Sequence, residues 1–282
     1  MKVIQKVGVL GAGQMGAGIA YVCAAAGYRV ALVDKDQESL TKGHEKIQGF
    51  SVQYAPANAC DQSQKDILGR IEFSLDVNAL ISSQMVIEAI PENEDLKIEI
   101  LKHIGTLIGA DVPICTNTSA LSVTRLSKHV SYPERFMGLH FMNPVPLMPL
   151  VELVQSFSTC EDAAHLVSAF VASLGKTAVE CADTPGFIVN RLLIPMINEA
   201  IYIFAEGAAP VEDIDEAMRL GTNHPMGPLE LADLIGLDTC LAIMRRLYEG
   251  FSDSKYRPCP LLVQYVDAGR LGRKSKKGFY DY

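Results

Sequence analysis

Short apolar runs and amphipathic stretches alternate along the first two thirds of the chain. Each apolar run is short enough for a buried strand, and stretches with helical periodicity, notably Asp95–Ile108 and Ala163–Leu174, separate several of them. The expected strands are Lys6–Leu10, Arg29–Val33, Met85–Ala89, Ile114–Thr116, Phe136–Leu139 and Val151–Val154. This alternation predicts an α/β domain, a doubly wound and mostly parallel sheet with helices on both faces.

The pattern changes after Cys181. Three helical stretches follow, at Phe187–Phe204, Val211–Leu220 and Leu229–Leu247, with no convincing strand among them. We therefore predict two domains, an α/β domain over residues 1–184 and an all-helical domain over residues 185–282. The apolar excess in residues 187–204 and 229–244 further predicts a homodimer formed through the helical domain.

One stretch of the first domain, residues 43–69, fits the alternation less well. It is polar and poor in periodic apolar residues. We interpret it as a protruding helical or partly mobile arm.

Composition and charge exclude several classes of protein. The formal charge of −8 argues against sequence-independent nucleic-acid binding, and no apolar run reaches the roughly 18 to 20 residues of a membrane span. The first six residues lead directly into a strand pattern without the architecture of a signal peptide. The seven cysteines are scattered and form no CxxC, which favours free thiols and no structural metal. Together these features predict a cytoplasmic protein.

A glycine-rich turn directly follows the first expected strand. In Gly11-Ala12-Gly13-Gln14-Met15-Gly16, the first glycine permits a tight turn, the second lets the backbone approach a pyrophosphate, and the third lets helix and strand pack closely. The following helix would offer its amide groups and positive dipole end to phosphates, and Gln14 and Met15 within the turn are expected to bind the cofactor as well. The alternative is a glycine-rich turn that binds nothing.

Asp34 ends the second expected strand, 18 residues after Gly16. A carboxylate there accepts both ribose hydroxyls and repels a 2′-phosphate, which favours NAD over NADP. Lys35, the next residue, is the one feature that opposes this preference.

A second set of polar residues surrounds the end of the strand near 136–139. His140 ends this strand, and a short Pro-containing connection with Asn143 leads to the next strand, which holds Glu152, so the two side chains can meet at adjacent strand ends. A carboxylate facing a histidine fixes its tautomer and stabilises the imidazolium formed when it takes a proton. The alternative for His140 is a turn or capping residue.

With these residues in place, the sequence resembles the 3-hydroxyacyl-CoA dehydrogenase family over essentially its whole length, and most closely the family's short, single-function bacterial form. The matching blocks are Val9–Gly16, Asn117–Ser119, Gly138–Pro146, Leu150–Glu152, Thr184–Arg191, Asn223–Pro228 and Gly278–Tyr280, together with the tail segments Lys255–Pro258 and Leu271–Ser275.

The resemblance implies a reversible, NAD-dependent oxidation of a 3-hydroxyacyl-CoA, of short chain, with 3-hydroxybutyryl-CoA and acetoacetyl-CoA as the expected pair. It implies that His140 is the base and Glu152 its partner, and that Ser119 and Asn190 bind the reacting oxygen atoms. The residues it places around the nicotinamide half of the cofactor are Glu92, Lys97, Asn117, Asn143 and Lys274. Ser119 has an alternative as the cap of a helix starting near Leu121, and Asn190 as a polar contact within its helix.

Three positions depart from the family pattern. Residues 50–64 contain no lysine where the family's arm commonly carries several that meet the CoA phosphates, although Lys46 and Lys65 flank this stretch. Ala120 replaces a frequent serine, and Lys276 replaces a frequent glycine.

Three other functions compete with this one. The β-hydroxyacid dehydrogenases use a lysine of the helical domain, but no lysine occurs between Lys176 and Lys255. The same hydride chemistry on an acyl group carried by a carrier protein would suit the lysine-poor arm. A non-catalytic, crystallin-like NAD-binding protein is the third alternative, and the presence of all four expected catalytic residues argues against it.

Overall fold

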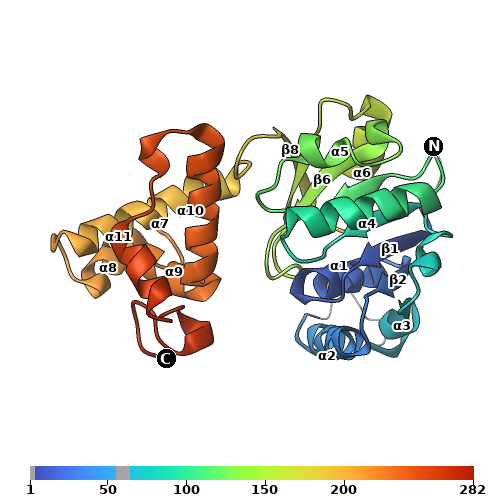
Figure 1. Ribbon diagram of the computed structural model, residues 1–282. Helices are drawn as coiled ribbons and strands as arrows, with labels where there is room; N and C mark the ends of the chain where they lie inside the picture. Colours follow the sequence, from blue (N-terminus) through green and yellow to red (C-terminus); the bar gives the residue numbers. More distant parts are fainter. Residues whose placement is uncertain (1–3, 55–63) are drawn as a thin grey trace. The chain divides into compact units, whose positions relative to one another are not determined.

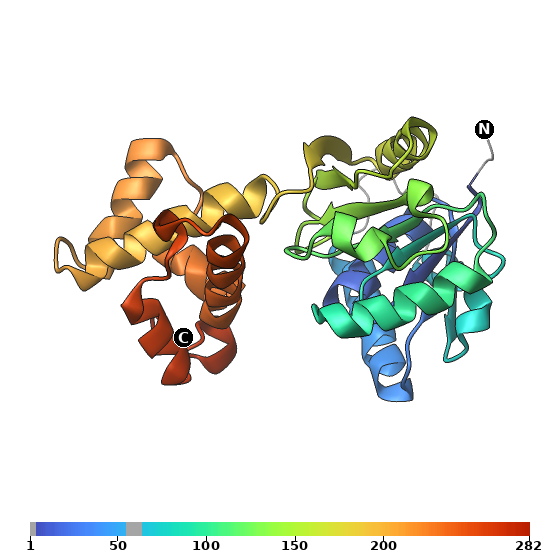
Figure 2. The same ribbon diagram turned by 45° about the horizontal axis from the view of Figure 1, so that its top comes forward.

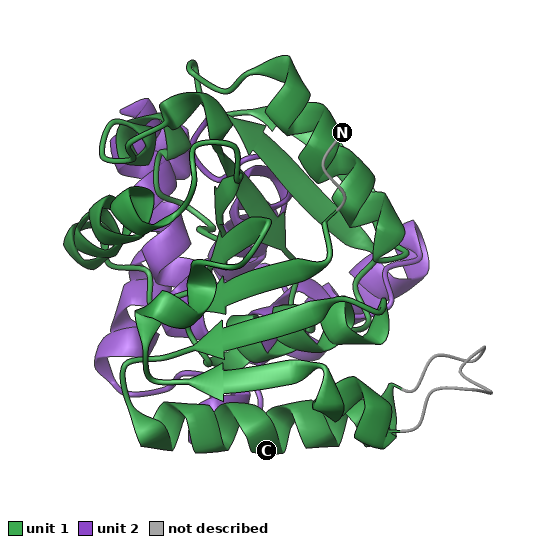
Figure 3. Ribbon diagram, turned by 90° about the vertical axis from the view of Figure 1, so that its right-hand side faces the viewer, with its two compact units in different colours: residues 1–183 green, residues 184–282 purple. Residues whose placement is uncertain are grey.

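The computed structural model describes residues 4–54 and 64–282. The chain divides into two compact units, residues 1–183 and residues 184–282, which Figure 3 distinguishes by colour.

Unit 1 contains an eight-stranded sheet in the order β3-β2-β1-β4-β5-β6-β7-β8. The strands are β1 (Lys6–Leu10), β2 (Arg29–Val33), β3 (Ile71–Ser74), β4 (Met85–Glu88), β5 (Ile114–Thr116), β6 (Phe136–Phe141), β7 (Leu150–Gln155) and β8 (Thr177–Ala182). All neighbours pair in parallel except β6 and β7, which are antiparallel. The predicted doubly wound, mostly parallel sheet is confirmed, with β3 and β8 as edge strands that the apolar pattern did not reveal.

Helices surround this sheet (Figures 1 and 2). They are α1 (Gln14–Ala25), α2 (Gln37–Gln53), α3 (Gln64–Gly69), α4 (Glu94–Leu107), α5 (Val123–Ser127) and α6 (Glu161–Ser173), with the short 3₁₀ turns η1 (Val77–Leu80) and η2 (Pro133–Arg135). The ends of the expected arm at 43–69 are helical, in α2 and α3. Its middle, residues 55–63, lies outside the described residues.

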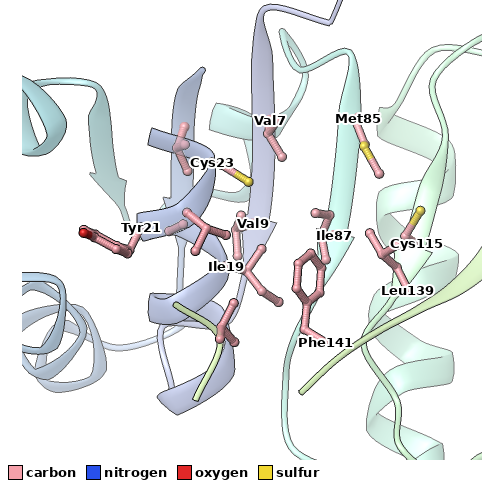
Figure 4. Packing of buried hydrophobic residues seen from close by; sticks show 14 of the residues in the cluster. Val7, Val9, Ile19, Tyr21, Cys23, Met85, Ile87, Cys115, Leu139 and Phe141 are labelled. Carbon is pink, nitrogen blue, oxygen red and sulfur yellow. The ribbon is translucent and has the colours of Figure 1, made fainter. Parts of the chain in front are cut away.

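The two faces of the sheet differ in what they bury. One face contributes Val9, Ile87 and Leu139 to an apolar cluster with side chains of α1 such as Ile19 (Figure 4). Because successive side chains of a strand point to opposite faces, His140 points away from this cluster, which contains both of its neighbours in β6. The other face also buries apolar side chains, such as Val86 and Phe136, and His140 and Glu152 lie among them.

Unit 2 is helical and has its own buried apolar cluster. It consists of α7 (Val189–Ala205), α8 (Val211–Thr222), α9 (Pro228–Ile235), α10 (Leu237–Phe251) and α11 (Pro260–Asp267), with the 3₁₀ turns η3 (Ser254–Tyr256) and η4 (Arg273–Ser275). The single helix expected over Leu229–Leu247 is wrong, because Gly236 takes φ = 101° and separates α9 from α10. Among the described residues, no helix is both long and apolar enough to span a membrane.

A buried aspartate, Asp215, connects the C-terminal tail to the helices of unit 2 by hydrogen bonds. The carboxylate of Asp215 is fully buried and accepts hydrogen bonds from the backbone amides of Leu229 (2.7 Å) and Glu230 (2.9 Å), in the first turn of α9. It also accepts from the hydroxyl of Tyr280 at 2.8 Å. This one side chain therefore both accepts hydrogen bonds from the unpaired amides at the start of α9 and holds Tyr280 near the end of the chain.

Replacing Asp215 with alanine should destabilise the protein by about 2–4 kcal/mol, since two amide donors and one hydroxyl would lose their buried acceptor. The free energy of unfolding, measured by urea denaturation of the full chain, checks this. Asp213→Ala is the matched control, because Asp213 is exposed in the first turn of α8 and should contribute at most about 1 kcal/mol. Equal losses in the two variants would contradict the anchoring role of Asp215.

Candidate active site

The glycine turn lies between β1 and α1. Gly11 takes φ = 102°, and a Cβ atom built on it would lie 2.6 Å from the carbonyl oxygen of Ala89. A Cβ atom on Gly16 would lie 1.7 Å from the carbonyl oxygen of Gly11, so the packing of the turn itself requires both glycines. A Cβ atom on Gly13, in contrast, would meet no described atom within 4 Å. The open side of Gly13 is where a ligand can approach the backbone.

A cavity of about 490 Å³ adjoins this turn, with Gly11, Gly13, Gln14, Met15 and Asp34 in its lining. Asp34 accepts a hydrogen bond from the amide of Ala12 through Oδ2 and from the amide of Lys35 through Oδ1, both at 2.7 Å. Each carboxylate oxygen can accept further bonds, so both remain suited to ribose hydroxyls.

Opposite the turn, Ile90, Leu96 and Ile100 give the cavity an apolar wall. The first turn of α1 carries no acidic side chain that would repel phosphates. The glycine cradle, the carboxylate and the apolar wall fit a dinucleotide.

A buried ion pair supports the cavity from behind. Lys97, which is 1% exposed, donates from Nζ to Oε1 of Glu88 at 2.6 Å and to the carbonyl oxygen of Ile90 at 3.2 Å. Glu88 is fully buried and also accepts from the hydroxyl of Thr116. Lys97 was predicted to lie beside the nicotinamide. In the structure its ammonium is buried inside unit 1, where it connects the first turns of α4 to the end of β4. Glu88 could not be singled out from the sequence, because it stands at the end of an apolar run.

Glu92 lies under the loop that carries Ser119. Its Oε1 atom accepts from the amides of Ser119 (3.0 Å) and Ala120 (3.1 Å) and from the hydroxyl of Thr118. The cap of α5 is Ser122, so the alternative role of Ser119 as a helix cap is wrong. Glu92 therefore holds the loop in shape, and its Oε2 atom lies 3.5 Å from Nζ of Lys97.

His140 and Glu152 face each other across the antiparallel pair of strands. They are register partners of β6 and β7, and Nδ1 of His140 lies 2.7 Å from Oε2 of Glu152. Glu152 is fully buried and His140 is 7% exposed. His140 is thus a strand residue paired with a carboxylate, and the alternative of a turn or capping residue is wrong.

The thiol of Cys181, on the strand next to Glu152, adds no negative charge near this carboxylate. Burial raises the pKa of Cys181 on β8 to about 12, with further contributions from the charges of Glu152 and Asp183. The thiol therefore stays protonated at neutral pH and adds no second anion beside Glu152.

Asn117 precedes His140 in the chain, and Asn143 follows it by three residues. Oδ1 of Asn117 accepts from the amide of Phe141 at 2.9 Å, which joins the end of β5 to the end of β6 beside His140. Asn143 is exposed and precedes a cis peptide bond to Pro144.

Lys176 holds the loop between β6 and β7. Its Nζ atom donates to the carbonyl oxygens of Val145 (2.7 Å) and Met148 (2.8 Å). Burial lowers the pKa of this lysine. The loop that follows Asn143 is therefore tied down by a side chain that the sequence did not single out.

The remaining expected residues belong to unit 2. Asn190 lies in the first turn of α7, and Lys274 lies in η4, where it forms an ion pair with Asp238. Lys276 takes φ = 59°, a left-handed conformation that favours glycine.

Two glycine variants test the dinucleotide site. Gly13→Ala should fold with unchanged stability, since its Cβ atom meets open space, yet raise the Kd for NADH at least tenfold by occupying the space of a pyrophosphate. Gly16→Ala should lower the melting temperature by several degrees, because its Cβ atom overlaps backbone. Fluorescence titration with NADH and thermal unfolding measure both effects. An unchanged Kd in Gly13→Ala would contradict the assignment of the turn to phosphate binding.

Two family models together match almost the whole chain. The family model described as "3-hydroxyacyl-CoA dehydrogenase, NAD binding domain" matches residues 6–184, and the model of the C-terminal domain of the same family matches residues 186–282.

Relatives match over nearly the whole chain. The 3-hydroxybutyryl-CoA dehydrogenase of Bradyrhizobium diazoefficiens is 50% identical over 99% of this chain and 96% of its own length. A probable 3-hydroxybutyryl-CoA dehydrogenase of Bacillus subtilis is 47% identical, covering 99% of this chain and 98% of its own. The crystal structure of an (S)-3-hydroxybutyryl-CoA dehydrogenase from Ralstonia eutropha superposes with a TM-score of 0.94, at 45% identity and 99% coverage of both chains. The chain therefore belongs to the 3-hydroxyacyl-CoA dehydrogenase family of NAD-dependent oxidoreductases.

Proposed function

We propose that this protein catalyses the reversible oxidation of (S)-3-hydroxybutyryl-CoA to acetoacetyl-CoA, with His140 and Glu152 as its acid–base pair. The observation that carries the proposal is the buried contact of 2.7 Å between Nδ1 of His140 and the carboxylate of Glu152. The names of the relatives in Bradyrhizobium and Ralstonia support the substrate and its stereochemistry.

The protein's own groups handle the proton. When bound, NAD supplies the acceptor of the hydride that leaves C3 of the substrate. Nε2 of His140 takes the proton of the 3-hydroxyl group, and Glu152 holds the ring through Nδ1 and stabilises the imidazolium. In the reductive direction, His140 returns the proton to the 3-keto oxygen.

Substrate binding is assigned to polar groups near this pair. We assign the hydroxyl of Ser119 and the amide of Asn190 to the reacting oxygen atoms, and the amides Asn117 and Asn143 to the region of the nicotinamide. Glu92 acts on that region through the hydrogen bonds that hold the Ser119 loop, and Lys97 acts on it through its ion pair with Glu92. Lys274 is assigned a contact to the cofactor from unit 2.

The preference for NAD follows from the charges around the cavity. Asp34 and Asp36 both lie in its lining, with Lys35 between them. A 2′-phosphate on the ribose would meet two carboxylates and one ammonium, so NADPH should be used far less efficiently than NADH.

The proposal includes a homodimer formed through unit 2 and a location in the cytoplasm. Leu192 on α7 and Leu220 on α8 are more than 70% exposed, and exposed apolar side chains of this kind support a homodimer formed through unit 2. Light scattering should then give twice the protomer mass of 30.7 kDa, and a single protomer mass at low micromolar concentration would contradict the dimer.

A second candidate keeps the fold and the His140 chemistry but uses an acyl group on a carrier protein. The absence of lysine from residues 50–64 favours it, because CoA carries phosphates that lysines of an arm would meet.

The proposal predicts that NADH is oxidised rapidly on addition of acetoacetyl-CoA, and that His140→Ala lowers kcat by about 10²- to 10⁴-fold. The Kd for NADH should not change, since the dinucleotide cavity does not include His140. Absorbance at the NADH band measures the rate. His165→Ala is the matched control, because His165 is exposed on α6.

The other outcomes separate the alternatives. Turnover of acetoacetyl on a carrier protein without turnover of the CoA thioester would replace the proposal with the second candidate. NADH binding without turnover of either substrate would indicate a non-catalytic NAD-binding protein. Full activity of His140→Ala would contradict the assigned base.

A further inference from the structure

Two carboxylates hold the chain segment that contains Ser119. We define the Ser119 segment as residues 118–124, which connect the region after β5 to the start of α5. Glu92 accepts hydrogen bonds from the first three of its residues. Asp183 accepts from the last three. Neither Glu92 nor Asp183 belongs to the Ser119 segment. Asp183 follows the last residue of the segment, Thr124, by 59 residues in the sequence.

The contacts of Asp183 use both of its carboxylate oxygens. Oδ2 accepts from the hydroxyl of Ser122 at 2.8 Å and from the amide of Thr124 at 2.8 Å, while Oδ1 accepts from the amide of Val123 at 3.1 Å. The first amides of a helix have no partner within the helix. Because α5 has only five residues, it has little stability of its own, and these contacts determine where it begins.

From this arrangement we infer that Asp183 is a positioning residue for catalysis, acting on substrate through Ser119. The inference rests on the proposed function, in which the hydroxyl of Ser119 binds a reacting oxygen atom. Asp183 itself contacts only Ser122, Val123 and Thr124 in the hydrogen bonds given above. It acts by keeping the downstream end of the segment in place while Glu92 keeps the upstream end.

The place of Asp183 in the chain adds to its role. Asp183 is the last residue of unit 1, and the next peptide bond leads into unit 2 at Thr184. Asp183 is therefore both the residue at which the chain leaves unit 1 and an acceptor of hydrogen bonds from the Ser119 segment. A displacement of about 1 Å at a group that orients substrate can lower a rate by roughly 100-fold, so a loosened segment should be visible in kinetics.

The test is a double-mutant cycle between Asp183 and Ser119. Asp183→Asn keeps the shape of the side chain but places an NH₂ donor against donors, and it should lower kcat/KM for acetoacetyl-CoA about tenfold. In a Ser119→Ala background, the same change should lower kcat/KM less than twofold, because the hydroxyl that Asp183 positions is gone. The Kd for NADH should stay the same in all variants. Asp253→Asn, which removes the charge of another capping aspartate at η3, is the matched control.

A purely structural role gives a different result. If Asp183→Asn only weakens the fold, it should lower kcat/KM by the same factor with and without Ser119, and that outcome would overturn the inference. Unchanged kcat/KM in the single variant would also overturn it. Should Asp183→Asn fail to fold, Ser122→Ala removes one of the three contacts together with the bond that caps α5 at Arg125, and it should show a loss that likewise disappears beside Ser119→Ala.

The proposed function fails in a distinguishable way. A wild-type protein that leaves NADH unoxidised with acetoacetyl-CoA would reject the proposed function and the inference together. A Ser119→Ala variant as active as wild type would reject the role of Ser119 and, with it, the role of Asp183. An active wild type, an impaired Ser119→Ala and independent losses in the cycle would reject the inference alone.

Discussion

The buried contact between Glu152 and His140 constrains the whole of unit 1. A carboxylate without water around it costs several kcal/mol unless a partner compensates its charge and lone pairs. Here the partner comes from the neighbouring strand, in the one antiparallel pair of the sheet. A slip of one residue in that register would turn His140 into the apolar cluster and leave Glu152 without its partner. Strand register, core and site therefore depend on each other.

The loops around this pair are supported by buried or half-buried charges in addition to apolar packing. Glu88 and Lys97 form a pair beneath the cofactor cavity, and Glu92 extends it to the loop of Ser119. Lys176 holds the loop after β6 in a similar way. Polar supports of this kind satisfy loop backbone groups that lie inside the protein, and they set atomic positions through directional bonds. The glycine turn complements them by leaving open space where a ligand must approach.

Much of this could be predicted from the sequence, where local patterns carry the information. The glycine turn, Asp34 and the strands of the sheet's centre follow from period and spacing, and His140 and Glu152 follow from their places on consecutive strands. The edge strands β3 and β8 were missed because edge strands alternate with exposed polar residues. The break at Gly236 was missed because helical periodicity continues across it, and Glu88 because it reads as the end of an apolar run. The hydrogen bonds between Asp183 and the start of α5 join residues that are 59 to 61 positions apart, and no local pattern encodes such contacts.

The most direct measurement of the role of the buried pair is the single-turnover rate of NADH oxidation by Glu152→Gln with acetoacetyl-CoA, followed by stopped flow. Glutamine keeps the shape of the side chain and removes its charge, and Glu180→Gln on the exposed face of β8 provides the comparison. If Glu152 orients His140 and stabilises its charged form, the rate constant should fall by about 10²- to 10⁴-fold while NADH binds as in wild type. A rate constant within twofold of wild type would contradict that role.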